Sequence, residues 1–187
     1  MTDDAIRWRK IASEPGPDIP LFRVRLDQMR HPSSSEEFSR MVLESSDWIN
    51  VVATTEDGSI VMVEQYRFGI EDITIEPVGG LVDEGEEPID AAKRELLEET
   101  GYGGGEWRLL GVIQANPAIH NNYCHLWRAD GVRLVGEQNL DSGEAINVHL
   151  MSIEQVRGAI ADGRFMHPLG QAAMSRVYPL WDHEVQG

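Results

Sequence analysis

The sequence is poor in cysteine and has no long apolar run. Cys124 is the single cysteine among 187 residues, so the chain cannot form an internal disulfide, as is usual for proteins of the reducing cytoplasm. A transmembrane helix needs about 20 consecutive apolar residues, and no stretch of this sequence approaches that length. The opening residues MTDDAIRWRK also lack the apolar segment of a secretory signal. We therefore expect a cytoplasmic protein with no membrane partner.

Positive charge is also scarce. The chain has 16 Lys and Arg residues against 32 Asp and Glu residues, which gives a formal net charge of −16. This charge repels nucleic acid and anionic lipid, so we expect no polymeric nucleic acid as partner. A small anionic substrate remains compatible with it, because divalent cations bound to carboxylates reverse the local field.

The residues from Pro88 to about Thr100 are predicted to form a helix with one buried side. Pro88 suits the first turn of a helix, where its missing N–H costs nothing. Gly101 suits the left-handed residue that follows the last turn. Apolar residues such as Ala92 and Leu96 recur at helical spacing, which indicates the side that packs on a core.

Three carboxylates lie together on another face of this helix. Glu95, Glu98 and Glu99 stand at positions i, i+3 and i+4, where like charges destabilise an isolated helix unless a cation compensates them. Carboxylate oxygens are the ligands that Mg²⁺ and Mn²⁺ prefer. Gly79 and Gly80 precede the helix and allow the backbone to approach a ligand closely. The pattern favours a divalent metal site, and a solvated acidic face is the alternative.

The segment of 23 residues from Gly80 to Tyr102 resembles the Nudix box. Its specified positions are, in order, Gly80, five residues, Glu86, seven residues, Arg94-Glu95, the aliphatic Leu96, one residue, Glu98-Glu99, one residue, Gly101 and the apolar Tyr102. Every specified position is filled, which makes the signal highly specific.

The resemblance implies a strand, loop and helix that bind Mg²⁺, or Mn²⁺, and hydrolyse a nucleoside diphosphate linked to another group. It implies Glu95 and Glu99 as the main metal ligands and Glu98 as a further ligand or acid–base group. The carbonyl of Gly79 is implied as an additional ligand. Glu86 and Arg94 are implied to support the catalytic loop and helix. The number of bound ions stays open.

Two charged residues outside the box are candidates for the same site. Arg67 ends an expected strand, and its guanidinium could form a forked contact with a diphosphate. A surface ion pair is the alternative for Arg67. In the family that the chain resembles, a loop glutamate often serves as metal ligand or general base, and Glu144 matches it. A solvated loop carboxylate is the alternative for Glu144.

Trp48 and Pro117 are candidates for substrate recognition. Trp48 starts an expected strand and could stack on a nucleobase, although an aromatic residue there more often belongs to the core. Pro117 lies fifteen residues beyond Tyr102, a position whose proline resembles the ADP-ribose pyrophosphatase subgroup. Its alternative is a turn that ends a strand.

The remaining pattern indicates an α/β (α+β) protein with a mixed sheet between helices, as in the α-β-α sandwich that the resemblance implies. Strands are expected at 48–54, 60–66, 73–76, 107–114, 123–129 and 146–151, and helices at 152–161 and 167–178. The dipeptide Asp130-Gly131 is expected to form a turn, after which residues 132–135 pair back.

Residues 1–45 are expected to form an N-terminal β segment, and residues 46–187 the hydrolase domain. Alternation around Phe22 and Val24 indicates one strand of the segment, and Phe38, Met41 and Leu43 suggest another. By analogy with the family, this segment builds a homodimer.

The favoured function is Mg²⁺-dependent hydrolysis of a nucleoside diphosphate sugar, ADP-ribose first, into a nucleoside monophosphate and a sugar phosphate. The alternatives are GDP-mannose, dinucleoside polyphosphates or nucleoside triphosphates as substrates, or a module that only binds a nucleotide and regulates another protein.

Overall fold

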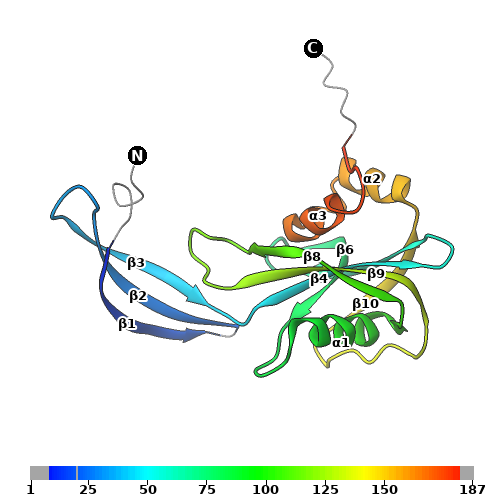
Figure 1. The fold of residues 1–187 in the computed structure, drawn as a ribbon, viewed down its shortest axis with the longest axis horizontal. Coiled ribbons are helices and arrows are strands. Elements are labelled where there is room, and N and C mark those ends of the chain that lie inside the picture. The colour runs from blue at the N-terminus through cyan, green and yellow to red at the C-terminus, as the bar shows by residue number, and fades with distance from the viewer. Residues whose placement is uncertain (1–8, 20, 182–187) are drawn as a thin grey trace, which may run out of the picture. The chain divides into compact units, whose positions relative to one another are not determined.

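The computed structural model describes residues 9–19 and 21–181, and the chain forms two compact units (Figure 1). The three-stranded unit comprises Met1–Ser46 and Gln114–Tyr123. The seven-stranded unit comprises Asp47–Ile113 and Cys124–Gly187.

The three-stranded unit is an antiparallel sheet in the order β1-β2-β3, formed by Arg9–Ile19, Phe22–Arg30 and Glu37–Glu44. The two strands expected in this region are present. Strand β1 was not predicted, because its sequence RKIASEPGPDI carries Pro and Gly in place of an alternating pattern. An edge strand tolerates such residues, and the register of β1 against β2 shifts twice along its length.

A buried carboxylate ties the strands of this sheet together. Asp27 on β2 is 3% exposed and accepts hydrogen bonds from Ser13 on β1, at 2.6 Å, and from Nε of Arg25, at 3.0 Å. The ammonium of Lys10 lies 3.0 Å from the same carboxyl group. The hydrogen bonds from Arg25, Ser13 and Lys10 hold the pKa of Asp27 well below its usual range, although burial opposes them.

The seven-stranded unit is built on a mixed sheet in the order β10-β5-β6-β4-β9-β7, with β8 pairing β9. The strands are β4 (Trp48–Thr55), β5 (Ile60–Arg67), β6 (Asp72–Leu81), β7 (Tyr102–Gly103), β8 (Glu106–Gln114), β9 (Tyr123–Leu134) and β10 (Ile146–Met151). β4 and β9 run parallel, whereas β4 pairs antiparallel with β5 and β6. The predicted mixed sheet is confirmed.

Helices cover both faces of this sheet, as the α-β-α expectation requires. Figure 1 shows α1 (Pro88–Thr100) on one face, and α2 (Ile153–Ala161) and α3 (Pro168–Ser175) on the other. Apolar side chains of α1 such as Leu96 join the core formed by alternate residues of β4 and β5. Ser152 caps α2 with a capping box, because its side chain accepts from the N–H of Gln155 while the side chain of Gln155 accepts from the N–H of Ser152. No helix in the described ranges is long and apolar enough to cross a membrane.

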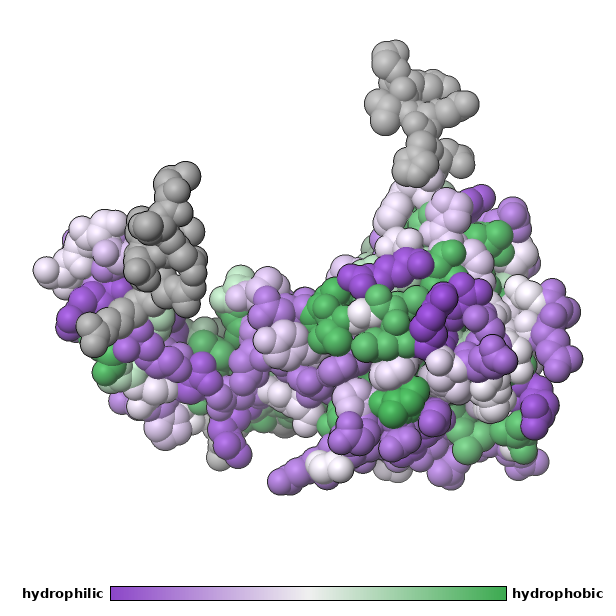
Figure 2. All heavy atoms as spheres, viewed as in Figure 1, coloured by the Kyte–Doolittle hydropathy of each residue, from purple (hydrophilic) through white to green (hydrophobic). Residues whose placement is uncertain are grey.

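Strand β8 contributes little to that core. Figure 2 shows apolar side chains gathered on the surface over β8, where Leu109 and Val112 are 47% and 44% exposed.

Three predicted boundaries are wrong. Asp130-Gly131 is not a turn, because β9 continues to Leu134 and absorbs Gly131, at φ 73°, as an irregularity opposite Thr54 and Thr55. Burial of Val132 on the far side of this irregularity makes the continuation favourable. β6 continues through Gly79 and Gly80, which pair with β4, rather than ending at Glu76. The last helix ends at Ser175, three residues short of the predicted Tyr178.

Candidate active site

The end of β6 and the face of α1 are packed against each other so closely that only glycine fits between them. A Cβ atom on Gly80 would overlap the carboxyl group of Glu95, and a Cβ atom on Gly79 would overlap the side chain of Asn50. Gly80 therefore lets α1 place Glu95 directly on β6, and Gly79 leaves room for Asn50 of β4. Gly101 closes the helix at φ 74°, and its N–H donates to the carbonyl of Leu97 at 2.8 Å.

Arg94 connects the loop before α1 to the helix. Its Nε and Nη2 donate to the two carboxyl oxygens of Glu86, at 3.0 Å and 2.9 Å, and Nη2 also donates to the carbonyl of Leu81 at 2.9 Å. Its Nη1 donates to Glu95 at 2.9 Å and to Glu98 at 3.1 Å. The hydrogen bond to Glu86 is the largest of the effects that raise the pKa of Arg94, while burial opposes them. Arg94 is thus a fixed cation among three carboxylates.

Glu99 is the most unusual of the carboxylates. It is 4% exposed, and its Oε2 has no hydrogen-bond partner within the described part of the chain. Burial raises the pKa of Glu99 to about 9, the charges of Glu95 and Glu144 add to this rise, and Arg67 and a backbone hydrogen bond from Gly79 oppose it. A buried carboxylate with an unpaired oxygen is a group that a bound cation would stabilise.

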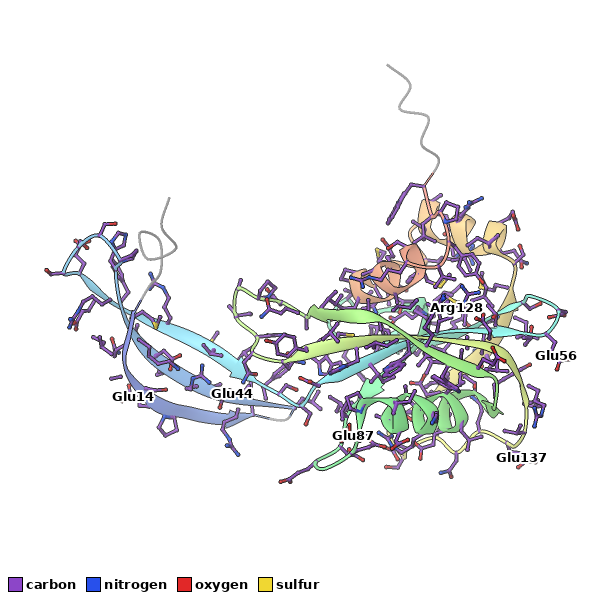
Figure 3. All side chains as sticks on the ribbon, in the orientation of Figure 1. Glu14, Glu44, Glu56, Glu87, Arg128 and Glu137 are labelled. Atoms are coloured by element: carbon purple, nitrogen blue, oxygen red, sulfur yellow. The ribbon has the colours of Figure 1, made fainter. Side chains whose placement is uncertain are left out.

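The other acidic residues lie at increasing exposure around Glu99. Glu95 is mostly buried, and burial raises its pKa, as do the charges of Glu98 and Glu144, while Arg94 lowers it. The side chain of Glu98 is 36% exposed. Glu144 lies in an exposed loop, where its Oε2 accepts the N–H of Asp141 at 3.0 Å. Figure 3 shows Glu87 at the start of α1, at the end of the acidic loop that precedes these residues.

The carboxylates are suited to a divalent metal in chemistry, but they are not gathered into a ligand set as they stand. Among the described residues, no group of three or more His, Cys, Asp or Glu side chains is arranged to hold a metal ion. Arg94 Nη1 lies between Glu95 and Glu98 and neutralises them in this arrangement. The unpaired Oε2 of Glu99 and the raised pKa values of Glu95 and Glu99 are the observations that fit a cation here.

Arg67 is bound to a residue that the sequence reasoning missed. Its Nε and Nη2 donate to the two oxygens of Glu76, at 2.9 Å and 2.5 Å. Glu76 is 2% exposed, so the pair is not the surface ion pair considered as the alternative for Arg67. A signal was present in the sequence, since Glu76 is a single acidic residue between Ile75 and Pro77-Val78 in a strand that is otherwise buried there.

Trp48 and Pro117 occupy different settings. Trp48 begins β4, is half-buried and pairs with Leu81 on β6 and with Cys124 on β9. Pro117 belongs to the three-stranded unit, in an exposed turn where the carbonyl of Asn116 accepts the N–H groups of Ile119 and His120, at 3.1 Å and 2.8 Å. The carboxylates of the site all belong to the seven-stranded unit.

Residues 47–169 match the family model of the NUDIX domain. The chain is 33% identical over 139 residues to the ADP-ribose pyrophosphatase of Mycobacterium tuberculosis, an alignment that covers 74% of this chain and 67% of that protein. It is 30% identical over 116 residues to the ADP-ribose pyrophosphatase of Bacillus subtilis. That alignment covers 62% of this chain and 63% of the relative, which is less than two thirds of the relative's length.

The fold is similar to that of a solved structure described as an ADP compounds hydrolase. The two chains superpose with a TM-score of 0.79 and 19% sequence identity, over 91% of this chain and 92% of the other. At this identity the likeness establishes the fold.

Proposed function

The chain belongs to the Nudix family, and on that premise we propose that it hydrolyses the pyrophosphate bond of a nucleoside diphosphate sugar, ADP-ribose first. The observation that carries this proposal is the acidic face of α1, where the buried Glu99 has an unpaired oxygen in the field of Glu95 and Glu144. The two relatives named ADP-ribose pyrophosphatase support the choice of substrate.

Members of this family generally use a divalent metal ion, and we propose Mg²⁺ for this chain, with Mn²⁺ as a substitute. Glu95 and Glu99 would be the main ligands of the ion, together with the carbonyl of Gly79. Glu98 and Glu144 would each serve as a further ligand or as the acid–base group. A bound divalent cation neutralises the charge of phosphoryl oxygens and lowers the pKa of a coordinated water. Arg94 would still hold Glu86 and the loop through Nε and Nη2 if its Nη1 gave up Glu95 and Glu98 to the ion.

Hydrolysis breaks one P–O bond of the pyrophosphate bridge. The oxygen of water bonds to one phosphorus, the bridging oxygen leaves with the other phosphate, and the water proton passes to a carboxylate. We assign that proton to Glu144 or Glu98, because both carboxyl groups are accessible to solvent. Arg67 donates to the diphosphate oxygens, and Trp48 offers its ring to the base. For ADP-ribose the products are AMP and ribose 5-phosphate.

A product assay on a substrate panel tests the proposal. The panel contains ADP-ribose, GDP-mannose, UDP-glucose, diadenosine tetraphosphate and ATP, each with Mg²⁺, with Mn²⁺ and with a chelator. Metal-dependent release of AMP chiefly from ADP-ribose is the expected result. If another compound were preferred, the proposed reaction would stand and ADP-ribose would be the wrong substrate. If no compound were hydrolysed, the proposal would be contradicted.

We also propose that the three-stranded unit takes part in a homodimer. The unit exposes large apolar side chains, since Ile19 is 43%, Leu21 71% and Met41 48% exposed. Its edge strand β1 offers backbone groups for pairing, as does β3 outside Leu43, whose backbone is bonded to Ile119 and Asn121. A dimeric mass in solution at micromolar concentration is expected, and a monomeric mass would contradict this assignment.

A further inference from the structure

Glu76 is a charged side chain among buried apolar neighbours in the sheet. It lies on β6 opposite Val63 of β5 and is 2% exposed. A carboxylate at such a position is costly unless its oxygens are hydrogen-bonded and its charge is balanced. Glu76 therefore needs groups that donate hydrogen bonds to it and balance its charge.

The partners of Glu76 occupy both of its oxygens. Oε1 accepts from Nε of Arg67 at 2.9 Å and from the hydroxyl of Thr74. Oε2 accepts from Nη2 of Arg67 at 2.5 Å, and Nδ1 of His167 lies 3.5 Å from the same oxygen. With its oxygens held in this way, Glu76 does not belong to the carboxylates that face the proposed metal.

Arg67 is the cation that balances Glu76. Burial lowers the pKa of His167, although Glu76 opposes this shift, so His167 is neutral near pH 7. Burial would raise the pKa of Glu76, but the hydrogen bonds from Arg67 and Thr74 and the charges nearby bring it below its usual value. The pair is thus an ionised carboxylate and a guanidinium, joined by two parallel hydrogen bonds.

The geometry of this pair leaves one edge of the guanidinium available. Glu76 takes the edge formed by Nε and Nη2 of Arg67, and Nη1 has no hydrogen-bond partner among the described residues. The Arg67 side chain is 43% exposed, although its Nε and Nη2 are held by the buried Glu76. The charges of Glu99 and Glu144 also act on Arg67, which shows that the guanidinium lies within their electrostatic reach.

We propose that Glu76 is a positioning residue, which holds the guanidinium of Arg67 so that its outer edge donates to the diphosphate of the substrate. The proposal rests on the proposed function, since it needs a diphosphate at the acidic site. A free arginine side chain would lose rotamer entropy when it binds phosphate, and a guanidinium already fixed by Glu76 avoids most of that loss. Glu76 thereby acts on binding through Arg67 rather than by touching the substrate.

A double-mutant cycle on ADP-ribose hydrolysis tests this role. Glu76→Gln and Arg67→Ala are each expected to raise KM about tenfold or more with a smaller change in kcat, because a misplaced contact weakens binding. In the Arg67→Ala background, Glu76→Gln should raise KM no further. An equal effect of Glu76→Gln with and without Arg67, or no effect on KM, would overturn the proposal.

Glu64→Gln is the matched control. Glu64 lies on β5 with Arg67, but its carboxyl group contacts Asn147 at 3.2 Å and His149 at 3.3 Å, so the same chemical change leaves the contact between Arg67 and Glu76 in place. This variant should keep the KM of the unaltered protein. A rise in KM equal to that of Glu76→Gln would show that any lost carboxylate on these strands has the effect, and would overturn the proposal.

Binding of α,β-methylene ADP-ribose in the presence of Mg²⁺ separates the two proposals, because its P–C–P bridge is not hydrolysed. If the unaltered protein binds this analogue and Glu76→Gln weakens binding about tenfold, the positioning role stands even when ADP-ribose is not turned over. If ADP-ribose is hydrolysed and Glu76→Gln binds the analogue normally, the proposed hydrolase function is supported. The positioning role of Glu76 is then contradicted. Absence of binding and turnover would overturn both.

Discussion

The carboxyl group of Glu95 lies against the Cα of Gly80, in the space that a Cβ atom of residue 80 would need. Gly80→Ala should therefore displace Glu95 from the strand, destabilise the fold by about 1–3 kcal/mol and lower kcat at least tenfold, roughly the cost of overpacking a tight contact at a site. Thermal unfolding and steady-state kinetics on ADP-ribose measure both effects.

Gly158→Ala is the control for that variant. A Cβ atom on Gly158 in α2 would meet nothing within 4 Å, so the same substitution causes no collision there. Alanine is more favourable than glycine in a helix by about 1 kcal/mol, so this variant should be at least as stable. Its activity should be unchanged. Normal kinetics of Gly80→Ala would show that the position of Glu95 does not matter for turnover.

Replacing the buried Glu99 by Gln removes a charge with little change of volume. We expect the fold to be kept and turnover to fall by at least about a hundredfold, because a proposed metal ligand is lost. Glu56→Gln in the β4–β5 turn makes the same change at an exposed position and should leave turnover intact. If Glu99→Gln hydrolysed ADP-ribose normally, the metal assignment would be wrong.

The acidic helix was predictable from sequence because its determinants are local. Pro88 and Gly101 mark the ends that α1 has in the structure, and the spacing of Glu95, Glu98 and Glu99 places them on one helix. The resemblance to the Nudix box is confirmed by the family match. Assignment of individual ligands remains a prediction.

The parts that escaped prediction depend on contacts between distant residues. The hydrogen bonds between Arg67 and Glu76 follow from the pairing of β5 with β6, which a short motif does not encode. Strand β1 is held by its pairing with β2 and by Asp27, in spite of unfavourable local residues. The sequence around Gly131 predicts a turn, but the burial of Val132 keeps β9 in the sheet.

The raised pKa of Glu99 predicts how the stability of the metal-free protein depends on pH. The pKa rises from 4.5 to about 9 on folding, so between these values the folded state holds a proton that the unfolded state has lost. The stability associated with neutral Glu99 is present below the unfolded pKa and is lost as pH rises through the folded pKa. Urea unfolding in chelator between about pH 5 and pH 9 should show stability falling more steeply than in Glu99→Gln. If the free energy of unfolding depended on pH in the same way in both proteins, the raised pKa of Glu99 would be contradicted.

Metal binding should restore the folding stability that the metal-free protein loses at high pH. An ion held by Glu99 needs the carboxylate, so Mg²⁺ must displace the proton that Glu99 carries near pH 7. We expect release of up to about one proton per bound ion and stronger binding at higher pH. Titration calorimetry in two buffers of different ionisation enthalpy measures the proton count. Mg²⁺ binding without proton release at pH 7 would place the ion away from Glu99.

Arg94 makes a forked contact with Glu86 that lysine cannot reproduce. Arg94→Lys keeps the positive charge but loses the paired hydrogen bonds of 3.0 Å and 2.9 Å, so the loop of residues 83–87 should open more often. We expect faster amide exchange in that loop and kcat/KM lower by about 10- to 100-fold, the usual cost of losing a support of an active site. Arg157→Lys, which removes a contact with the carbonyl of Pro179, is the control and should change neither. If Arg94→Lys lowered activity while exchange in the loop stayed slow, Arg94 would act through its contacts with Glu95 and Glu98 rather than through the loop.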